Sequence, residues 1–205
     1  MKTKHVMAGL MAGALGLTGC ETYAGELLTR FDVAEDHTRF VFAPQPVHEN
    51  GMPAYGNPFV TQGYIYPAGT LAGNVTGVNE DGSPAFPDKV LGTWTCDGWF
   101  VGEGGNTETG VWLVSRQIYE FADGDVLITQ GTEIADIDKS NARPITGGSG
   151  DYADVDGVMM QRLLGFNEHM GVNAGFEIVD RERQSSFAPI HVPEWKEETN
   201  PIRAD

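Results

Sequence analysis

The sequence predicts an all-β protein, folded as an eight-stranded antiparallel barrel. Glycine is abundant, with 27 residues in a chain of 205, and long helical runs are absent. Short β-prone segments alternate with turn residues from about residue 38 to residue 180. Eight such segments are found, and an even number of strands with short connections suits a closed barrel, which leaves no exposed edge.

The first twenty residues have the anatomy of a secretory signal. A basic head, Lys2 and Lys4, precedes an apolar run over 6–17 that is too short to span a bilayer as a permanent helix. The run ends in Leu17-Thr18-Gly19-Cys20, which resembles the bacterial lipobox. That resemblance implies lipidation of Cys20 and, because Glu21 follows, an anchor in the outer membrane facing the periplasm. The alternative is an ordinary signal peptide with a chance cysteine.

A lipidated Cys20 would leave Cys96 without a partner inside the chain. We therefore expect Cys96 to be a small buried apolar residue, with a reactive thiol as the alternative.

The remaining elements follow in chain order. Residues 21–37 have mixed polarity without a clear period and are predicted to be a tether. A first strand over 38–43 ends at prolines, and a long proline- and glycine-rich loop over 44–58 leads to a second strand over 59–66. After an irregular stretch, the other predicted strands are 90–101, 110–121, 126–135, 143–146, 158–164 and 172–179. The predicted organisation is a signal over 1–20, a tether over 21–37, a barrel over 38–180 and a polar tail over 181–205.

Charge and composition argue against several classes of partner. The net charge is -16, with 29 acidic and 13 basic residues, and such a surface repels phosphate backbones. The five histidines show no metal-ligand spacing, which argues against zinc. We therefore predict no nucleic acid partner and no metal.

The most distinctive internal motif is Ile145-Thr146-Gly147-Gly148-Ser149-Gly150-Asp151-Tyr152. Its glycines predict a sharp turn or bulge between two strands. The stretch from Gly148 to Ala153 also satisfies Gly-x-Gly-x-x-Ala, but the helix that a dinucleotide loop requires does not follow. A serine nucleophile elbow fails because Asp151 stands where glycine is needed. The aspartates that follow predict a solvated acidic turn, with a weak calcium site as the alternative.

Residues 126–180 resemble the allene oxide cyclase and dirigent superfamily. The features that match in order are the strand ending in Gln130-Gly131, the glycine motif, and Gly157 at the start of the next strand. The resemblance implies an eight-stranded barrel with an apolar interior, no cofactor, and assembly as a homodimer or homotrimer. It also implies chemistry on an apolar small molecule, either ring closure or the orientation of phenoxy radicals.

The resemblance supplies no catalytic residue. Plant cyclases of that family carry a glutamate at the end of the first strand. The segment predicted here as the first strand reads Phe40-Val41-Phe42-Ala43-Pro44, which contains no acid.

The hairpin around Ala122-Asp123-Gly124-Asp125 allows two faces to be derived. With Phe121 opposite Val126, alternation predicts a mainly apolar face that holds Gln117 opposite Gln130 and Tyr119 opposite Ile128. The other face places Arg116 diagonal to Glu133, within reach of an ion pair. We favour an outward, structural interpretation of this pair; an inward pair would be an acid/base device.

Two functions from different classes follow. The first is a cofactor-free cyclase, isomerase or lyase that holds an apolar small molecule in a reactive conformation. The second is a non-catalytic lipoprotein that binds or carries an apolar ligand. A cavity with a carboxyl group or a tyrosine shielded from bulk water would favour the enzyme, and a wholly apolar cavity would favour the carrier. Candidate catalytic residues are Tyr119, Glu133, Asp97 and Tyr64, and candidate ligand-binding residues are Gln117, Gln130, Trp94, Trp112 and Phe121.

Overall fold

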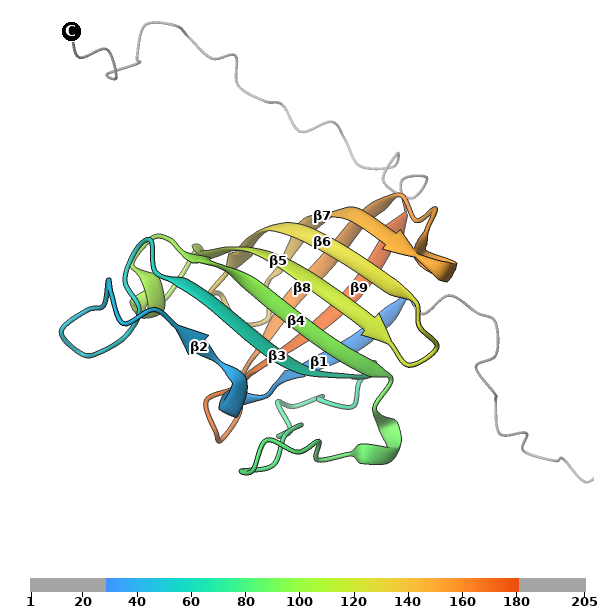
Figure 1. The fold of residues 1–205 in the computed structure, drawn as a ribbon, viewed down its shortest axis with the longest axis horizontal. Coiled ribbons are helices and arrows are strands. Elements are labelled where there is room, and N and C mark those ends of the chain that lie inside the picture. Colours follow the sequence, from blue (N-terminus) through green and yellow to red (C-terminus); the bar gives the residue numbers. More distant parts are fainter. Residues whose placement is uncertain (1–28, 181–205) are drawn as a thin grey trace, which may run out of the picture.

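The computed structural model describes residues 29–180, which form a closed antiparallel β-barrel (Figure 1). Its strands are β1 (Arg30–Glu35), β2 (Val41–Phe42), β3 (Pro58–Pro67), β4 (Gly92–Phe100), β5 (Val111–Phe121), β6 (Val126–Ile134), β7 (Ser140–Ser149), β8 (Gly157–Phe166) and β9 (Val172–Asp180). Four short 3-10 turns, η1 (His37–Arg39), η2 (Pro87–Lys89), η3 (Gly104–Asn106) and η4 (Gly150–Tyr152), lie in the connections. The predicted signal with Cys20 and the predicted tail from Arg181 lie outside the described residues.

Eight strands close the barrel, as the sequence predicts. The sheet runs β1-β9-β8-β7-β6-β5-β4-β3, and pairing of β1 with β3 completes the ring. The two-residue strand β2 pairs with the start of β3 and stands outside this ring. None of the described residues belongs to a helix long and apolar enough to cross a membrane.

The first barrel strand lies earlier in the chain than predicted. Residues 30–35, assigned to the tether, form β1, whereas the predicted strand over 38–43 contains η1 and only the two residues of β2. Five of the six β1 residues are buried, because the connection over 68–91 covers the outer face of β1 and β3. The outer face of β1 therefore buries Asp32 and Ala34, so this short strand lacks the solvent-exposed polar face of an ordinary half-buried strand.

The hairpin between β5 and β6 also differs from the prediction, by one residue. Glu120 pairs with Val126, and the Phe121 N–H donates to the Asp125 carbonyl, so the loop is one residue shorter than assumed. Gly124, at φ +96, makes this tight connection possible. The predicted inner face of β5 is correct from Leu113 to Phe121, whereas Val111 is exposed. The inner face of β6 holds Leu127, Thr129, Gly131 and Glu133, not the predicted set that includes Ile128 and Gln130.

The glycine motif forms the end of β7 and the turn that follows it. Its first part pairs with β6 through a bulge opposite Ile128 and Thr129, and Gly150 begins the turn η4 at φ +61. Gly148 lies against the backbone of Tyr152, and a Cβ there would overlap the Tyr152 carbonyl oxygen. The predicted bulge is therefore present inside the strand, and the sharp turn lies just beyond it.

This geometry distinguishes two neighbouring glycines. We expect Gly148→Ala to lower the free energy of unfolding by about 2 kcal/mol or more, because the new methyl group has to displace backbone. A Cβ at Gly147 meets no atom within 4 Å, so Gly147→Ala should change stability by less than about 1 kcal/mol. Urea unfolding of both variants measures the difference, and equal effects would contradict the described turn.

Candidate ligand-binding and active site

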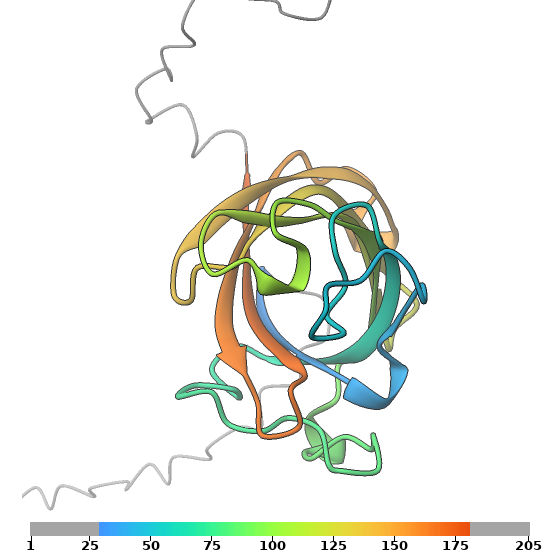
Figure 2. The same ribbon diagram turned by 90° about the vertical axis from the view of Figure 1, so that its left-hand side faces the viewer.

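The barrel interior is filled at one end and hollow at the other. At the end where β5 turns into β6, an aromatic cluster surrounds Phe31, whose ring lies 5.1 Å from Tyr119 and 5.4 Å from Phe176. Phe121 stacks on Tyr152 at 4.8 Å and extends this cluster. Figure 2 looks into the opposite end, where the connections over 43–57 and 101–110 surround the mouth of the barrel.

A cavity of about 520 Å³ occupies the mouth end. Its size lies in the range of small-molecule sites. Aromatic rings contribute much of the wall, namely Phe40, Phe42, Phe59, Phe100 and Phe166 with Trp94 and Trp112. Met52, Pro53 and Gly105 from the mouth connections also line it, and a hydrogen bond from the Gly105 N–H to the Pro53 carbonyl joins these connections at 2.8 Å.

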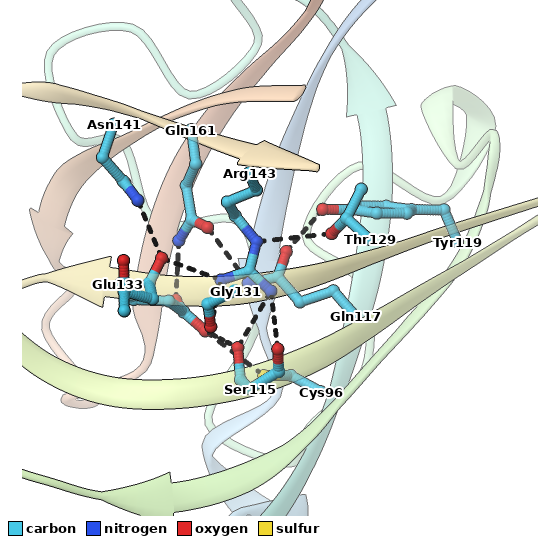
Figure 3. Close-up of polar contacts among 11 residues, drawn as sticks. Cys96, Ser115, Gln117, Tyr119, Thr129, Gly131, Glu133, Asn141, Arg143 and Gln161 are labelled. Carbon is cyan, nitrogen blue, oxygen red and sulfur yellow. Dashed lines mark hydrogen bonds and ion pairs between the residues drawn. The ribbon is translucent and has the colours of Figure 1, made fainter. Parts of the chain in front are cut away.

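A buried polar network forms the wall between the aromatic cluster and the cavity (Figure 3). Arg143 of β7 is fully buried and lies 3.6 Å from the Glu133 carboxylate. Its guanidinium donates to the Ser115 carbonyl and hydroxyl, both at 3.0 Å, and to the Thr132 carbonyl at 3.1 Å. Gly131 has no side chain on the inner face of β6, and the guanidinium lies against its carbonyl oxygen. Each nitrogen of the buried cation therefore has an oxygen partner.

Glu133 is the centre of this network. The Ser115 hydroxyl donates to one carboxylate oxygen, and the Gln161 amide donates to the other at 2.6 Å. The Cys96 thiol lies 3.6 Å from Glu133. Glu133, Gln161 and Cys96 all reach the cavity, so one polar edge interrupts its apolar wall.

The network continues toward the aromatic cluster through two side chains of β5. The Gln117 amide donates to Gln161 at 3.1 Å, and the Tyr119 hydroxyl donates to Gln117. Burial raises the pKa of Tyr119 far above its usual range, so its phenol is a hydrogen-bond donor. Gln117 and Tyr119 lie behind the cavity and do not line it.

A second carboxyl group, that of Glu35, lies in the cavity wall at the end of β1. Burial raises its pKa to about 7. The interaction of the carboxyl with the Thr61 side chain, and the Val172 N–H that donates to it at 2.8 Å, only partly oppose this. Within residues 29–180 it forms no ion pair with Lys or Arg, in contrast to Glu133. Glu35 is the last residue of the first barrel strand and lies five residues before the segment 40–44, which contains no acid.

Sequence reasoning missed Glu35 because the tether assignment covered β1. The alternation of Phe31, Val33 and Glu35 toward the interior was the available indication. Two histidines at the mouth, His37 and His169, were also missed; their rings stack at 4.9 Å. Contacts between residues 132 positions apart in the chain leave no local pattern.

Several predicted site residues lie away from the cavity. Asp97 is on the outer face, where Arg116 donates to it at 3.0 Å. The predicted pairing of Arg116 with Glu133 is therefore wrong: Arg116 faces outward as expected, but Glu133 is buried on the inner face. Tyr64 points outward and donates to the Gly82 carbonyl at 2.9 Å. Gln130 is exposed because of the shifted hairpin register, and Phe121 belongs to the aromatic cluster.

Trp94, Trp112, Glu133 and Cys96 do meet at the cavity. Trp112 reaches it although its neighbours Val114 and Arg116 face outward, because the register shifts between Val111 and Leu113. Cys96 is free and buried, as predicted, and burial raises the pKa of its thiol well above the ordinary value. A protonated thiol is a poor nucleophile.

The unpaired carboxyl predicts a specific dependence of stability on pH. The folded-state pKa of Glu35 lies above its ordinary value of 4.5, so its stabilising contribution is complete below that value and is lost as pH rises through about 7. We expect Glu35→Gln to be more stable than the parent by about 3 kcal/mol at pH 8 and nearly equal to it at pH 4. Denaturant unfolding between pH 4 and pH 8 measures the difference in the free energy of unfolding between the variant and the parent.

The exposed Glu120 on β5 provides the matched control. Glu120→Gln makes the same chemical change at a position that lies outside the cavity wall, and it should leave the pH dependence of the parent unchanged. A constant difference between Glu35→Gln and the parent at all pH values would contradict the burial of an unpaired carboxyl.

Comparison with known proteins places the fold. No family model and no curated protein matches the chain. Among solved structures, the pterocarpan synthase dirigent protein PsPTS1 matches with a TM-score of 0.52 at 16% identity, covering 73% of this chain and 90% of that one. A second, GePTS1, gives a TM-score of 0.49 at 10% identity, covering 79% and 96%. At such low identity the similarity shows the fold alone, and residues 29–180 have the eight-stranded barrel fold of dirigent proteins.

Proposed function

We propose that the protein is a cofactor-free cyclase, isomerase or lyase that acts on an apolar small molecule held in the mouth of the barrel. The observation that carries the proposal is a buried carboxyl group, Glu35, that lines an apolar cavity without a cationic partner among the described residues. The pterocarpan synthase dirigent protein PsPTS1, which has a similar fold, is by its name a synthase, and this is consistent with chemistry in such a barrel.

Glu35 acts as the general base in this proposal. A carboxyl group whose pKa is about 7 can remove a proton at neutral pH and return it to another position. The transfer moves one proton within the substrate and requires no oxidant or reductant. The aromatic walls restrict the substrate to a reactive conformation, which supplies part of the rate enhancement.

A carrier is the competing function, and the buried acid favours the enzyme over it. A carrier of apolar molecules gains nothing from an ionisable group in its wall. Keeping Glu35 buried lowers stability at neutral pH, and a cost of this kind is typical of functional sites.

The enzyme and the carrier differ in the compound that is recovered after incubation with the protein. The full-length protein is incubated with lipid and small-molecule extracts, and native mass spectrometry identifies the bound compound. For the enzyme, the compound recovered after incubation should change its chromatographic retention, with unchanged mass for a cyclase or isomerase. The rate should rise with pH through about 7 as Glu35 loses its proton.

Glu35→Gln should retain binding and lose turnover by at least about a hundredfold, the usual contribution of a general base. Trp99→Phe on the exposed outer face is the control that should leave both unchanged. Recovery of the compound unaltered from parent and variant alike would establish the carrier and overturn the enzyme.

We also propose that Cys20 carries a lipid that anchors the protein in the outer membrane. The support is the motif Leu17-Thr18-Gly19-Cys20, which lies outside the described residues. Cys20→Ser should move the protein from the membrane fraction to the soluble fraction on cell fractionation. Retention of the variant in the membrane would contradict the anchor.

A further inference from the structure

The charged groups in and around the cavity leave one carboxyl group, Glu35, unmatched. Glu133, the other carboxyl in the wall, lies 3.6 Å from the buried guanidinium of Arg143. Beyond the end of β1, Arg39 pairs with Asp36 at 3.2 Å. None of the described residues that line the cavity is Lys or Arg. The wall therefore carries one uncompensated negative charge whenever Glu35 is ionised.

Two histidines of the same wall, His37 and His169, are the remaining groups that can become positive. Their rings stack at 4.9 Å, and Nε2 of His169 lies 3.6 Å from the Glu168 carboxylate. Imidazole takes up a proton in mildly acidic solution, and an ordinary imidazole is neutral at pH 8. At that pH the histidines add aromatic rings to the wall and no charge that matches Glu35.

An indole lies on the same rung of the sheet as the unmatched acid. Glu35, Gly63 and Trp94 are register partners on the inner faces of β1, β3 and β4. Because Gly63 has no side chain, no side chain of this rung stands between the carboxyl group and the indole. Phenylalanine rings and the indole of Trp112 contribute much of the remaining wall. The cavity therefore combines a buried acid with aromatic surroundings.

An acid among aromatic rings is suited to the binding of an organic cation. Aromatic rings attract positive charge over their faces, tryptophan most strongly, and quaternary ammonium groups are recognised in this way. A carboxylate supplies the counter-charge, and its attraction for a cation is stronger inside a protein than in water. The net charge of -16 on the whole chain also favours the approach of a cation.

We propose that the cavity takes a largely apolar molecule that carries one positive charge, such as a quaternary ammonium or a protonated tertiary amine, with Glu35 as its counter-ion and Trp94 beside the charge. This inference rests on the proposed function, because it assumes that the cavity holds a small molecule next to Glu35. It names the chemical class of that molecule and adds Trp94 as a specificity-determining residue.

A bound cation also changes the protonation of Glu35. A positive charge beside the carboxyl group favours its ionised form and so lowers its pKa from about 7. At pH 7 about half of the empty protein carries this proton, so binding of a cation should release about half a proton per molecule bound. A neutral ligand of the same shape offers the carboxylate no counter-charge and should release none.

Two probes of the same shape test the inference on the full-length protein. Benzyltrimethylammonium is a cation, and neopentylbenzene has carbon in place of the nitrogen. In equilibrium dialysis at pH 8, Glu35→Gln should weaken the cation at least about tenfold, because the counter-charge is lost, and change neopentylbenzene less than about threefold. The variant should still fill with the cation at high concentration. Glu120→Gln makes the same change at an exposed position and should affect neither probe.

Two further measurements test the indole and the proton. Trp94→Leu should weaken the cation about tenfold, whereas binding of neopentylbenzene, which shows that the cavity is intact, should change less than about threefold. Calorimetry at pH 7 in buffers of different ionisation enthalpy measures the proton release, which should be present in the parent and absent in Glu35→Gln.

The outcomes separate the inference from the function beneath it. If neither probe binds the parent, the cavity takes no apolar ligand of this shape, and the proposed function and this inference both fail. If neopentylbenzene binds and the cation does not, the inference fails and the proposed function stands. Equal effects of Glu35→Gln on both probes, or a proton release that persists in this variant, would show that Glu35 is not the counter-ion. Equal effects of Trp94→Leu on both probes would overturn the role of the indole.

Discussion

The buried ion pair between Arg143 and Glu133 divides the barrel interior and determines where a ligand can lie. A guanidinium without solvent exposure is tolerated only when its N–H groups and its charge are matched, and here Ser115, Thr132 and Glu133 provide the match. On one side of this pair aromatic rings fill the barrel. On the other side the strands enclose the cavity, so the pair forms part of a rigid wall against which an occupant packs.

The two inward carboxyl groups of the cavity are suited to different tasks because their surroundings differ. Glu133 receives hydrogen bonds from Ser115 and Gln161 and pairs with Arg143, an arrangement that fixes its position. Glu35 interacts with the Val172 N–H and the Thr61 side chain, forms no ion pair with Lys or Arg among the described residues, and has a raised pKa. Carboxyls held in contrasting environments are a recurring basis for assigning acid–base roles. The contrast supports the proposal that Glu35 transfers the proton and that Glu133 holds the wall in place.

The sequence predicts the architecture better than the site. Alternation and turn residues locate seven barrel strands, and the glycine motif marks the bulge of β7. The prediction fails at β1, a six-residue strand that is buried on both faces and was assigned to the tether, and Glu35 was missed with it. Gly124, whose φ is positive, allows a hairpin loop one residue shorter than predicted. The shifted register places Glu133 on the inner face of β6 and Gln130 on the outer face. Arg143 was placed on a strand, but its partners come from β5 and β6, which local sequence cannot relate.

The proposed function depends most on Glu35, a carboxyl group that is shielded from water and has no cationic partner among the described residues. Carbon-13 NMR titration of the labelled Glu35 side chain, assigned by comparison with Glu35→Gln, measures this directly. For the protein without a ligand, we expect the titration midpoint of Glu35 to lie near pH 7. A midpoint at the ordinary glutamate value of 4.5 would mean that Glu35 is solvated or paired, and would contradict both the cavity chemistry and the proposed catalytic role.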